Sequence, residues 1–260
     1  MPALSVTIIT LNEADHIAAA IDSASWADEI IVVDSGSTDR TVAIAQSKGA
    51  RVESRAWTGY VDQKNFAASL ARHDWIFSLD ADERLTTDLE REIRALLATD
   101  PPVHGYRVPR TTFHFGRWIR TTDFYPDFQT RLYDRRHARW HGKYVHESVD
   151  VDGASGRLQQ ELQHYSYRDL SDHLARINHY TTLAARQMHE SGRRTGALDL
   201  LVHPPAAFLR NYILRRGFLD GTAGLTLSFV NAYSVFLKFA KLWEIQKTPN
   251  SQLPTPKKDS

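Results

Sequence analysis

The stretch FSLDADERL, residues 77–85, joins an apolar run to three closely spaced carboxylates. The apolar residues predict a buried strand, and Asp80, Asp82 and Glu83 follow where that strand ends. Like charges this close repel one another unless a positive charge lies between them. The acidic strand end therefore indicates either a cation site or a solvated turn whose acids cap the next helix.

The residues before and after this stretch alternate between strand-like and helix-like segments. The predicted strands cover residues 4–10, 29–35, 51–56 and 74–80. The predicted helices cover residues 13–24, 37–49, 60–72 and 86–97. Repeated units of this length predict an α/β fold, with a mostly parallel, Rossmann-like sheet that carries helices on both faces. Continuous apolar strands fit burial on both sides of the sheet.

Capping patterns suggest where two of these helices begin. Thr38 is a candidate N-cap of the second helix, and Gly49 is a candidate stop signal. In the fourth helix, Thr87 and Glu90 are spaced as a capping box ahead of an apolar periodic run.

Ligands of open α/β sheets bind beyond the carboxyl ends of the strands. Three polar clusters follow predicted strands, at residues 10–13, 34–37 and 80–82. We expect all three to lie along one edge of the sheet.

The remainder of the chain changes character. Residues 103–168 carry strand-like pieces at 104–110 and 127–136, rich in aromatic and basic residues, which predict an irregular antiparallel extension. Residues 169–191 are helical in pattern, and Pro204 and Pro205 predict a break after them. We divide the chain into a catalytic domain at 1–168, a helical extension at 169–247 and a disordered tail at 248–260.

Composition excludes several classes of function. The formal net charge is +1, so no overall field favours nucleic acid as a partner. The chain has no cysteine, which excludes disulfides, thiolate zinc sites and cysteine nucleophiles. The first residues, MPALSVTIITLNEADH, predict a strand rather than a signal peptide.

The acids at the end of the fourth strand suit a hard divalent cation. In an extended segment residues i and i+2 point the same way, so Asp80 and Asp82 can face one ion. Mg²⁺ or Mn²⁺ accepts one or two protein carboxylates and keeps positions open for phosphate oxygens. Asp34 and the Ser-Gly-Ser that follows it leave two alternatives open: contact with a base or ribose, or a turn that precedes a helix.

Taken together, these motifs carry a resemblance. VTIITLNEADHI, EIIVVDSGSTDRT, QKNFAA and WIFSLDADE resemble family 2 glycosyltransferases with the GT-A fold. RLYDRRHARWHGKYVHESV, LQHYSYRDLSDHL and FLDGTAGLTLSFVNAYSVFLKFAKLWE resemble the bacterial lipopolysaccharide core β-1,4-glucosyltransferases within that family. The Gln-x-x-Arg-Trp motif of processive synthases is missing from its usual setting, which favours addition of a single sugar.

The resemblance implies a nucleotide-sugar donor, with UDP-glucose as the expected compound. It places Thr10, Leu11 and Glu13 near the base and ribose, Asp34 at the uracil, and Lys64 at the nucleotide or its phosphates. It makes Asp80 and Asp82 a D-x-D pair, with Asp82 the more direct ligand of Mg²⁺ or Mn²⁺. His164 would complete the metal site, and neutral imidazole suits Mn²⁺ better than Mg²⁺.

An inverting transfer needs a base for the acceptor hydroxyl. Glu147 is the first candidate and Asp127 the second, although each could instead pair with an arginine; for Asp127 the expected partner is Arg131. Arg131 could hold a donor phosphate or form a structural ion pair. His146 could orient the acceptor or only pack.

Residues 207–245 are apolar and aromatic with interspersed Arg and Lys. We expect these charges to keep the clean apolar run shorter than a membrane span, so a helix lying in an anionic interface fits better. A core helix or a dimer contact is the alternative, and the oligomeric state stays open. The expected acceptor is a lipid-linked core oligosaccharide, which places the enzyme on the cytoplasmic face of the inner membrane. Transfer to a polyprenyl phosphate or a peptide, and a binding protein without catalysis, are the competing hypotheses.

Overall fold

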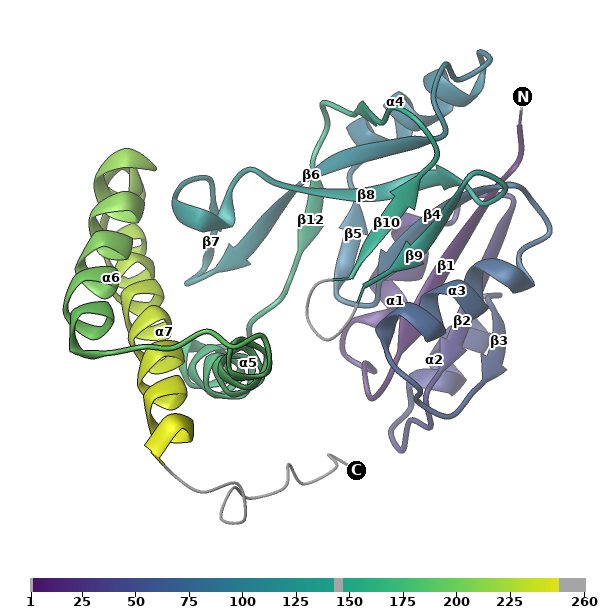
Figure 1. The fold of residues 1–260 in the computed structure, drawn as a ribbon. Helices are drawn as coiled ribbons and strands as arrows, with labels where there is room; N and C mark the ends of the chain where they lie inside the picture. The colour runs from purple at the N-terminus through teal and green to yellow at the C-terminus, as the bar shows by residue number, and fades with distance from the viewer. Residues whose placement is uncertain (1, 143–146, 248–260) are drawn as a thin grey trace. The chain divides into compact units, whose positions relative to one another are not determined.

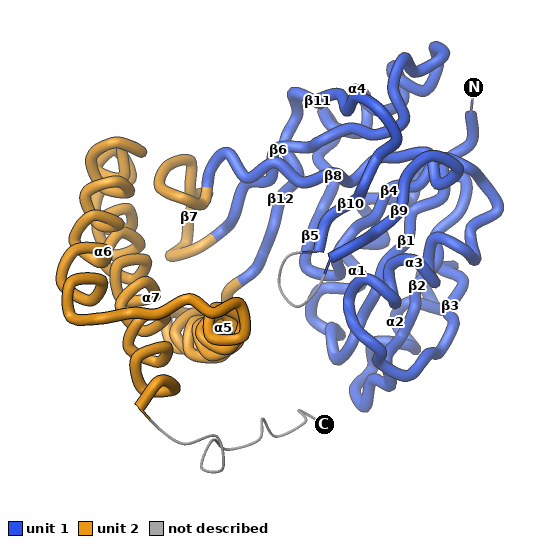
Figure 2. Tube along the Cα trace, in the orientation of Figure 1, with its two compact units in different colours: residues 1–113, 125–166 blue, residues 114–124, 167–260 orange. Residues whose placement is uncertain are grey.

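The computed structural model describes residues 2–142 and 147–247. The chain forms two compact units: unit 1 contains residues 1–113 and 125–166, and unit 2 contains residues 114–124 and 167–260 (Figure 2). The domain boundary at residue 168 stays a prediction. His146 and the tail at 248–260 lie outside the described residues.

Unit 1 is built on a mixed sheet with the strand order β3-β2-β1-β4-β8-β6-β12-β5 (Figure 1). Its strands are β1 (Leu4–Thr10), β2 (Glu29–Asp34), β3 (Arg51–Ser54), β4 (Trp75–Asp80), β5 (Glu83–Leu85), β6 (Gly105–His114), β8 (Asp127–Asp134) and β12 (Leu162–His164). Strands β1 to β4 pair in parallel, and β8 pairs antiparallel with both β4 and β6. The predicted α/β fold is confirmed. Of the antiparallel strands predicted within residues 103–168, β6 and β8 continue the main sheet.

Smaller strands complete this unit. The short β11 (Gly156–Arg157) pairs with β6, and β9 (Ala138–His141) and β10 (Ser148–Val151) form an antiparallel hairpin of their own.

Helices pack on both faces of the sheet, as the alternation of elements predicts. These helices are α1 (Ile17–Ser23), α2 (Thr41–Ser47), α3 (Tyr60–Leu70) and α4 (Thr87–Leu97). One apolar core joins β1 side chains such as Val6 and Ile8 to α1, α2 and α4. A second core joins Ile31 and Val33 of β2 to α3 and to the β9–β10 hairpin. The strands are buried on both sides because each face has its own cover.

Strand register brings the three polar clusters to one edge. Thr10 pairs with Asp34 across β1 and β2, and Ile9 pairs with Asp80 across β1 and β4. The expectation that the clusters share the carboxyl edge of the sheet is confirmed.

The helix starts differ from those predicted by capping patterns. The N-cap of α4 is Thr86, whose Oγ1 accepts a hydrogen bond from Leu89 N at 3.1 Å, so the capping box of Thr87 and Glu90 is wrong. Helix α2 begins at Thr41 instead of near Thr38. Thr38 N donates to Asn12 Oδ1 at 2.8 Å instead. Bonds between loops, which no local pattern encodes, take the place of caps here.

Unit 2 consists of helices and short segments. It contains β7 (Arg117–Ile119), the 3₁₀ turn η1 (Thr122–Phe124), α5 (Leu170–Glu190), α6 (Ala197–Leu209), the π-helical turn η2 (Arg210–Leu214), the 3₁₀ turn η3 (Gly217–Asp220) and α7 (Gly221–Lys247). The helix predicted at 169–191 is confirmed. The break predicted at Pro204 and Pro205 is wrong, because both prolines lie inside α6, which packs along α7.

One segment is compatible with a membrane span by its length and composition. Among the described residues, Gly217–Lys247 is long and apolar enough to cross a membrane by those two measures, with 28% of its most apolar window buried. The uncharged stretch between Asp220 and Lys238 is shorter than about 20 residues, as expected, although the whole segment is long enough to span. Buried side chains such as Leu227 and Leu242 show that α7 is also a packing helix of unit 2.

Two buried histidines lie side by side in unit 2. His114 Nε2 and His173 Nδ1 are 3.1 Å apart, and Tyr167 stacks on His173 at 4.1 Å between ring centroids. Burial, together with the charge of His114, lowers the pKa of His173 to about 4, and Asp172 opposes the shift. Burial also lowers the pKa of His114, against the charges of Asp172 and Asp169. The pair is therefore packed as neutral rings that share one proton.

This pair predicts acid sensitivity. The unfolded chain binds a proton at His173 below about pH 6.5, but the folded chain does so only near pH 4, so stability should be complete above 6.5 and fall as the pH drops between these values. The loss should reach about 3 kcal/mol. Urea unfolding of His173→Asn should show a shallower pH dependence over this range. Exposed His179 on the same helix provides the control, and an equal change in His179→Asn would contradict the assignment.

Candidate active site

A network of alternating charges closes the end of β4. Arg131 Nη2 lies 2.6 Å from Asp80 Oδ2 and 2.5 Å from Glu83 Oε1, and Lys64 Nζ lies 2.9 Å from Asp80 Oδ1. Arg110 joins Glu83 at 3.0 Å to Asp127 at 2.6 Å. Lys64 and Arg131 are only 5% and 3% exposed, so these pairs are desolvated.

The network holds its acids ionised. Burial would raise the pKa of Asp80, but the charges of Arg131 and Lys64 outweigh it and hold that pKa well below the ordinary value. Burial likewise lowers the pKa of Arg131, and Asp80 and Glu83 raise it beyond its ordinary value. Three carboxylates, from Asp80, Glu83 and Asp127, thus face three cations, from Lys64, Arg110 and Arg131.

Asp82 stands apart from this balance. Strand β4 ends at Asp80 and residues 81–82 form a turn, so the same-face alternation of a strand does not extend to Asp82. Its Oδ2 lies 3.2 Å from His164 Nε2, and Tyr165 N donates to its main-chain oxygen at 2.9 Å. Burial would raise the pKa of Asp82, but the hydrogen bond and charge of His164 lower it. Asp82 is therefore an ionised carboxylate that forms no ion pair with a lysine or arginine in the part of the chain that the structure describes, although the charge of Arg110 also lowers its pKa.

The Asp82–His164 pair has the donor set of a divalent cation site. A carboxylate oxygen and an imidazole nitrogen already face one another at 3.2 Å, and His164 Nδ1 is buried without a partner among the described residues. Oxygen and imidazole donors together suit Mn²⁺. Asp80 differs, because one of its oxygens is paired with Lys64 and the other with Arg131. The two aspartates are therefore not equally available to one metal ion.

Asp34 closes a turn at the end of β2. Its Oδ2 accepts bonds from Gly36 N and Ser37 N, both at 2.9 Å, and its Oδ1 accepts one from Ser37 Oγ at 2.5 Å. Gly36 has φ of 100°, which a side chain would strain. This geometry fits the turn alternative, and contact of Asp34 with a uracil stays a prediction.

The loop after β1 is tied to the loop after β2. Asn12, in left-handed conformation with φ of 55°, receives a bond from Thr38 N and donates its own N–H to Ser37 Oγ at 2.8 Å. Glu13 N donates to Thr41 Oγ1 at 2.8 Å. The two loops form one platform, which leaves Leu11 exposed beside them.

Buried polar atoms without partners gather at this edge. Among the described residues they include Thr10 Oγ1, Gln63 Oε1, Arg84 Nη1, His164 Nδ1 and Glu147 Oε2. A buried polar atom that lacks a partner costs free energy unless a ligand or water satisfies it. Their grouping around the carboxyl ends of the strands favours a polar ligand at this place.

The two candidate bases differ in their surroundings. Asp127 uses one oxygen for Arg110 and the other for Gln129 Nε2 at 2.6 Å, so its ion-pair partner is Arg110 rather than the expected Arg131. Burial would raise the pKa of Asp127, but Arg110 outweighs it and lowers that pKa, which weakens the carboxylate as a base. Glu147 is half-buried, precedes β10 and has its Oε2 unpaired among the described residues. The geometry favours Glu147 over Asp127.

Several residues that shape the site received no individual role in the sequence-based analysis. Glu83 and Arg110 belong to the charge network, and Asn12 joins the two loops. Arg84 packs over the ring of Tyr165 at 4.2 Å, and its Nη2 lies 3.4 Å from His16 Nδ1. Glu83 and Arg84 stand inside FSLDADERL, so the only available signal was their closeness to the D-x-D pair.

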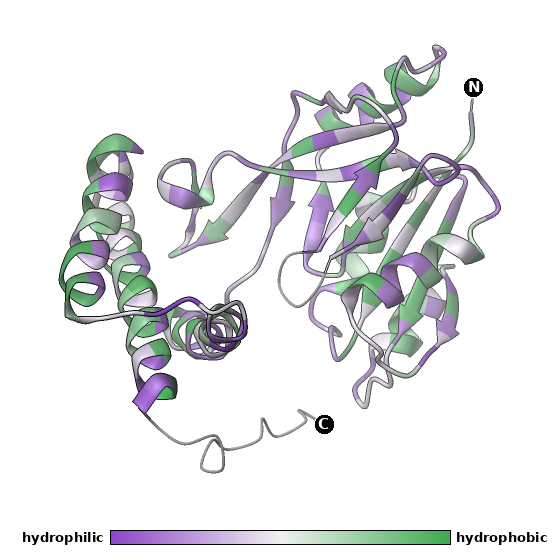
Figure 3. Cartoon of the chain, in the orientation of Figure 1, coloured by the Kyte–Doolittle hydropathy of each residue, from purple (hydrophilic) through white to green (hydrophobic). Residues whose placement is uncertain are grey.

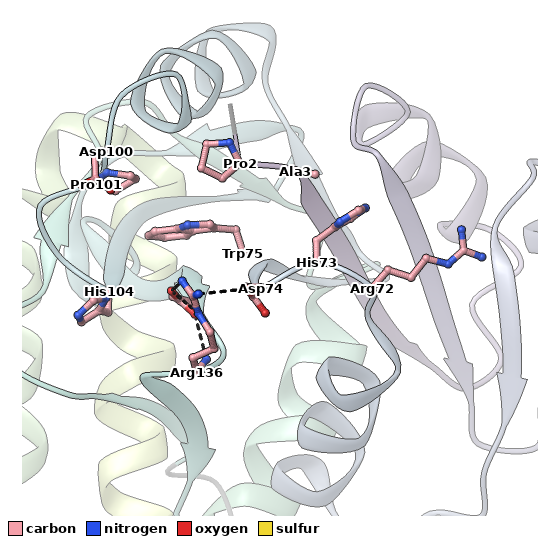
Figure 4. Close-up of a pocket in the computed structure, with 11 residues that line it drawn as sticks. Pro2, Ala3, Arg72, His73, Asp74, Trp75, Asp100, Pro101, His104 and Arg136 are labelled. Carbon is pink, nitrogen blue, oxygen red and sulfur yellow. Dashed lines mark hydrogen bonds and ion pairs between the residues drawn. The ribbon is translucent and has the colours of Figure 1, made fainter.

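A cavity of about 420 Å³ lies at the other edge of this sheet, where β1 and β4 begin (Figure 4). Among the described residues, His104, Asp134 and His137 there form the one group of three metal-ligand side chains with ligand atoms within 4.8 Å of one another. The two rings stack at 3.9 Å and 18°, so their in-plane lone pairs cannot converge on one ion. Arg136 also donates to both oxygens of Asp134. This cluster is not arranged as a metal site.

Residues 5–165 match the sequence family described as Glycosyl transferase family 2. The chain is 36% identical over 258 residues to an uncharacterized glycosyltransferase of Rickettsia felis, covering 94% of this chain and 90% of that protein. It is 33% identical over 248 residues to the lipopolysaccharide core biosynthesis glycosyltransferase LpsC of Rhizobium meliloti, covering 93% and 92%.

Among solved structures, glucosyl-3-phosphoglycerate synthase from Mycobacterium tuberculosis in complex with Mn²⁺, UDP and glucosyl-3-phosphoglycerate is similar to part of the chain. The identity is 28%, the TM-score is 0.36, and the match covers 44% of this chain and 45% of that one. This overlap is too small to support an inference about ligands.

The charge network predicts that Glu83 is critical for stability. Glu83→Gln removes the charge between Arg110 and Arg131, and breaking such a buried pair costs about 3–5 kcal/mol. Glu90→Gln, which breaks the exposed pair with Arg94 on α4, should cost less than about 1 kcal/mol. Urea unfolding followed by circular dichroism measures both. Equal losses in the two variants would show that the network does not stabilise unit 1.

Proposed function

The chain belongs to glycosyl transferase family 2 and is a glycosyltransferase, and we propose that it is an inverting, metal-dependent enzyme that transfers one hexose from a nucleotide sugar. The observation that carries this proposal is the Asp82–His164 pair, which stands beside a charge-balanced network and keeps a negative charge for a cation. UDP-glucose is the donor that we propose.

The proposed donor lies across the carboxyl edge of β1, β2 and β4. The platform of Thr10, Leu11, Glu13 and Asp34 would receive the nucleoside, and the diphosphate would reach Asp82 and His164. A bound Mg²⁺ or Mn²⁺ would supply Lewis-acid stabilisation of the leaving diphosphate. Lys64 and Arg131 act through Asp80, which they hold in place at the end of β4. We therefore assign these two cations a positioning role instead of direct phosphate contact.

The chemical step is a single displacement at the anomeric carbon. Glu147 takes the proton from the acceptor hydroxyl while that oxygen forms the glycosidic bond. The bond from the anomeric carbon to the donor diphosphate breaks, and the configuration at that carbon inverts. The unpaired Oε2 of Glu147 supports this role, whereas both oxygens of Asp127 are already engaged.

The proposed acceptor is a heptose of the lipopolysaccharide inner core. Similarity to LpsC over more than nine-tenths of each chain supports this assignment. Because such an acceptor is anchored in lipid, we place the enzyme on the cytoplasmic face of the inner membrane as a peripheral protein.

Replacement of Asp82 tests the metal site. Asp82→Asn should lower kcat by about 100-fold or more, because the leaving diphosphate loses its cation. Asp62→Asn, which removes an exposed acid on α3, should leave kcat unchanged. Release of UDP from UDP-glucose with added Mn²⁺ and purified core acceptor measures both. Normal turnover by Asp82→Asn would exclude this residue as a metal ligand.

Replacement of Glu147 tests the base. Glu147→Gln should bind UDP-glucose with wild-type affinity but lower kcat by about 100-fold or more. Glu53→Gln, at an exposed acid of β3, should behave as wild type. Calorimetry measures the affinity, and the same turnover assay measures kcat. A near-normal kcat in Glu147→Gln would transfer the role to another acid.

A further inference from the structure

Exposed apolar side chains concentrate in unit 2. Among the described residues, all large apolar side chains that are exposed belong to this unit except Leu11, Trp57 and Tyr60. Helices α6 and α7 run side by side, and many of their residues are hydrophobic (Figure 3). An exposed apolar surface of this extent on a folded unit marks a site of interaction.

The tip of the α6–α7 hairpin, defined as residues 209–219, carries the strongest part of this surface. Leu214 and Leu219 are 77% and 62% exposed, and Leu209, Ile213 and Phe218 are exposed with them. The tip consists of the end of α6, the π-helical turn η2 and most of the 3₁₀ turn η3. Such irregular helical turns present side chains that a straight helix would direct elsewhere.

Charge at the tip is one-sided. Arg210, Arg215 and Arg216 lie among the apolar side chains and are exposed. The one acid between residues 200 and 243 is Asp220, which is buried and paired inward with Arg117 at 3.0 Å and Thr121 Oγ1 at 2.6 Å. Within residues 209–219 the exposed charges are thus all positive, and the exposed acid Asp123 of η1 pairs with Arg210 and Arg215 but not with Arg216.

Polar contacts inside unit 2 fix the shape of the tip. Asp123 of η1 accepts bonds from Arg210 Nη2, from Arg215 Nε at 3.0 Å and from Asn231 Nδ2 at 2.6 Å. Gly224 of α7 lies so close to Gly217 that a Cβ there would come within 1.8 Å of Gly217 O. The apolar side chains are therefore displayed by an ordered scaffold, which lowers the entropic cost of binding.

We propose that this tip docks into the interface of an anionic phospholipid bilayer, with Leu214 and Leu219 among the acyl chains and Arg216 at lipid phosphates. The inference takes a membrane-bound acceptor from the proposed function and assigns the docking to particular residues. Apolar side chains flanked by three arginines, of which Asp123 pairs with two and leaves Arg216, match an anionic interface, which attracts cations and accepts apolar groups.

The rest of the hairpin argues for docking by the tip instead of a span. Lys241 of α7 donates to Asn178 Oδ1 and to Thr181 Oγ1 of α5, both at 2.8 Å. Leu242 and Ile245 pack on Ala185 of α5. A spanning α7 would have to give up these contacts, whereas a docked tip retains them.

Site-specific labelling tests the docking directly. Because the chain has no cysteine, Leu214→Cys and Leu198→Cys each provide one position for an environment-sensitive dye. Leu198 is 75% exposed but lies at the start of α6, about 20 Å of helix from its end. With the full chain and vesicles of phosphatidylcholine plus phosphatidylglycerol, the dye at 214 should shift to the blue and the dye at 198 should not. Pure phosphatidylcholine should give no shift.

Partitioning provides the second measurement. Leu214→Ser with Leu219→Ser should lower the vesicle partition coefficient by about tenfold or more, and Leu198→Ser by less than about twofold. Arg216→Gln should weaken binding to anionic vesicles. UDP affinity, measured by calorimetry, should stay unchanged in every variant and serves as the control for folding.

Four results would overturn the proposal. The first two are absence of vesicle binding and equal dye responses at positions 198 and 214. The third is binding that survives an alkaline wash, which would indicate a spanning helix. The fourth is a concentration-dependent dye shift without vesicles, which would indicate that a second copy of the chain binds the tip. Vesicle binding requires no turnover, so its failure would leave the proposed transferase chemistry standing. Failure of turnover with intact vesicle binding would reject the chemistry alone.

Discussion

Unit 1 depends on the buried ion pairs that Arg131 forms with Asp80 and Glu83. A desolvated guanidinium is tolerated only if its charge is matched and its hydrogen bonds are made. Here Asp80 and Glu83 match it, and Lys64 and Arg110 in turn balance those acids. The result is a charge-balanced, buried network at the carboxyl end of β4.

This charge network links strands from different parts of the sheet of unit 1. Asp80 comes from β4 in the parallel part of the sheet and Glu83 from β5 at its far edge, whereas Arg110 and Arg131 come from β6 and β8, which pair antiparallel with each other. Within this network Asp80 and Glu83 are paired with lysine and arginine. Asp82, in the turn after β4, pairs with His164 instead. His164 reaches it from β12, which pairs with β6 and β5. The proposed cation site therefore rests on how the acids are paired rather than on how many there are.

Much of the fold was predictable from the sequence, because burial on both faces leaves apolar runs that mark the strands of the parallel sheet. The shared edge of residues 10–13, 34–37 and 80–82 followed from topology alone. The resemblance implied that Asp82 is the more direct metal ligand, but the ion pairs that occupy Asp80 were not predictable, since they depend on Arg131 and Lys64, far away in sequence. The start of α2 at Thr41, the N-cap of α4 at Thr86 and the continuity of α6 through two prolines were missed for a similar reason, since contacts between segments outweigh local propensity. The roles of Glu147, Asp82 and His164 in catalysis stay predictions.

The most direct measurement is a crystal of the protein soaked with UDP and Mn²⁺, with data collected for anomalous scattering. The account predicts one anomalous peak within coordination distance of Asp82 and His164, with UDP phosphate oxygens on the same ion and with Asp80 still bound to Lys64 and Arg131. UDP bound with no ion at this position, or an ion on Asp80 that displaces Lys64, would contradict it.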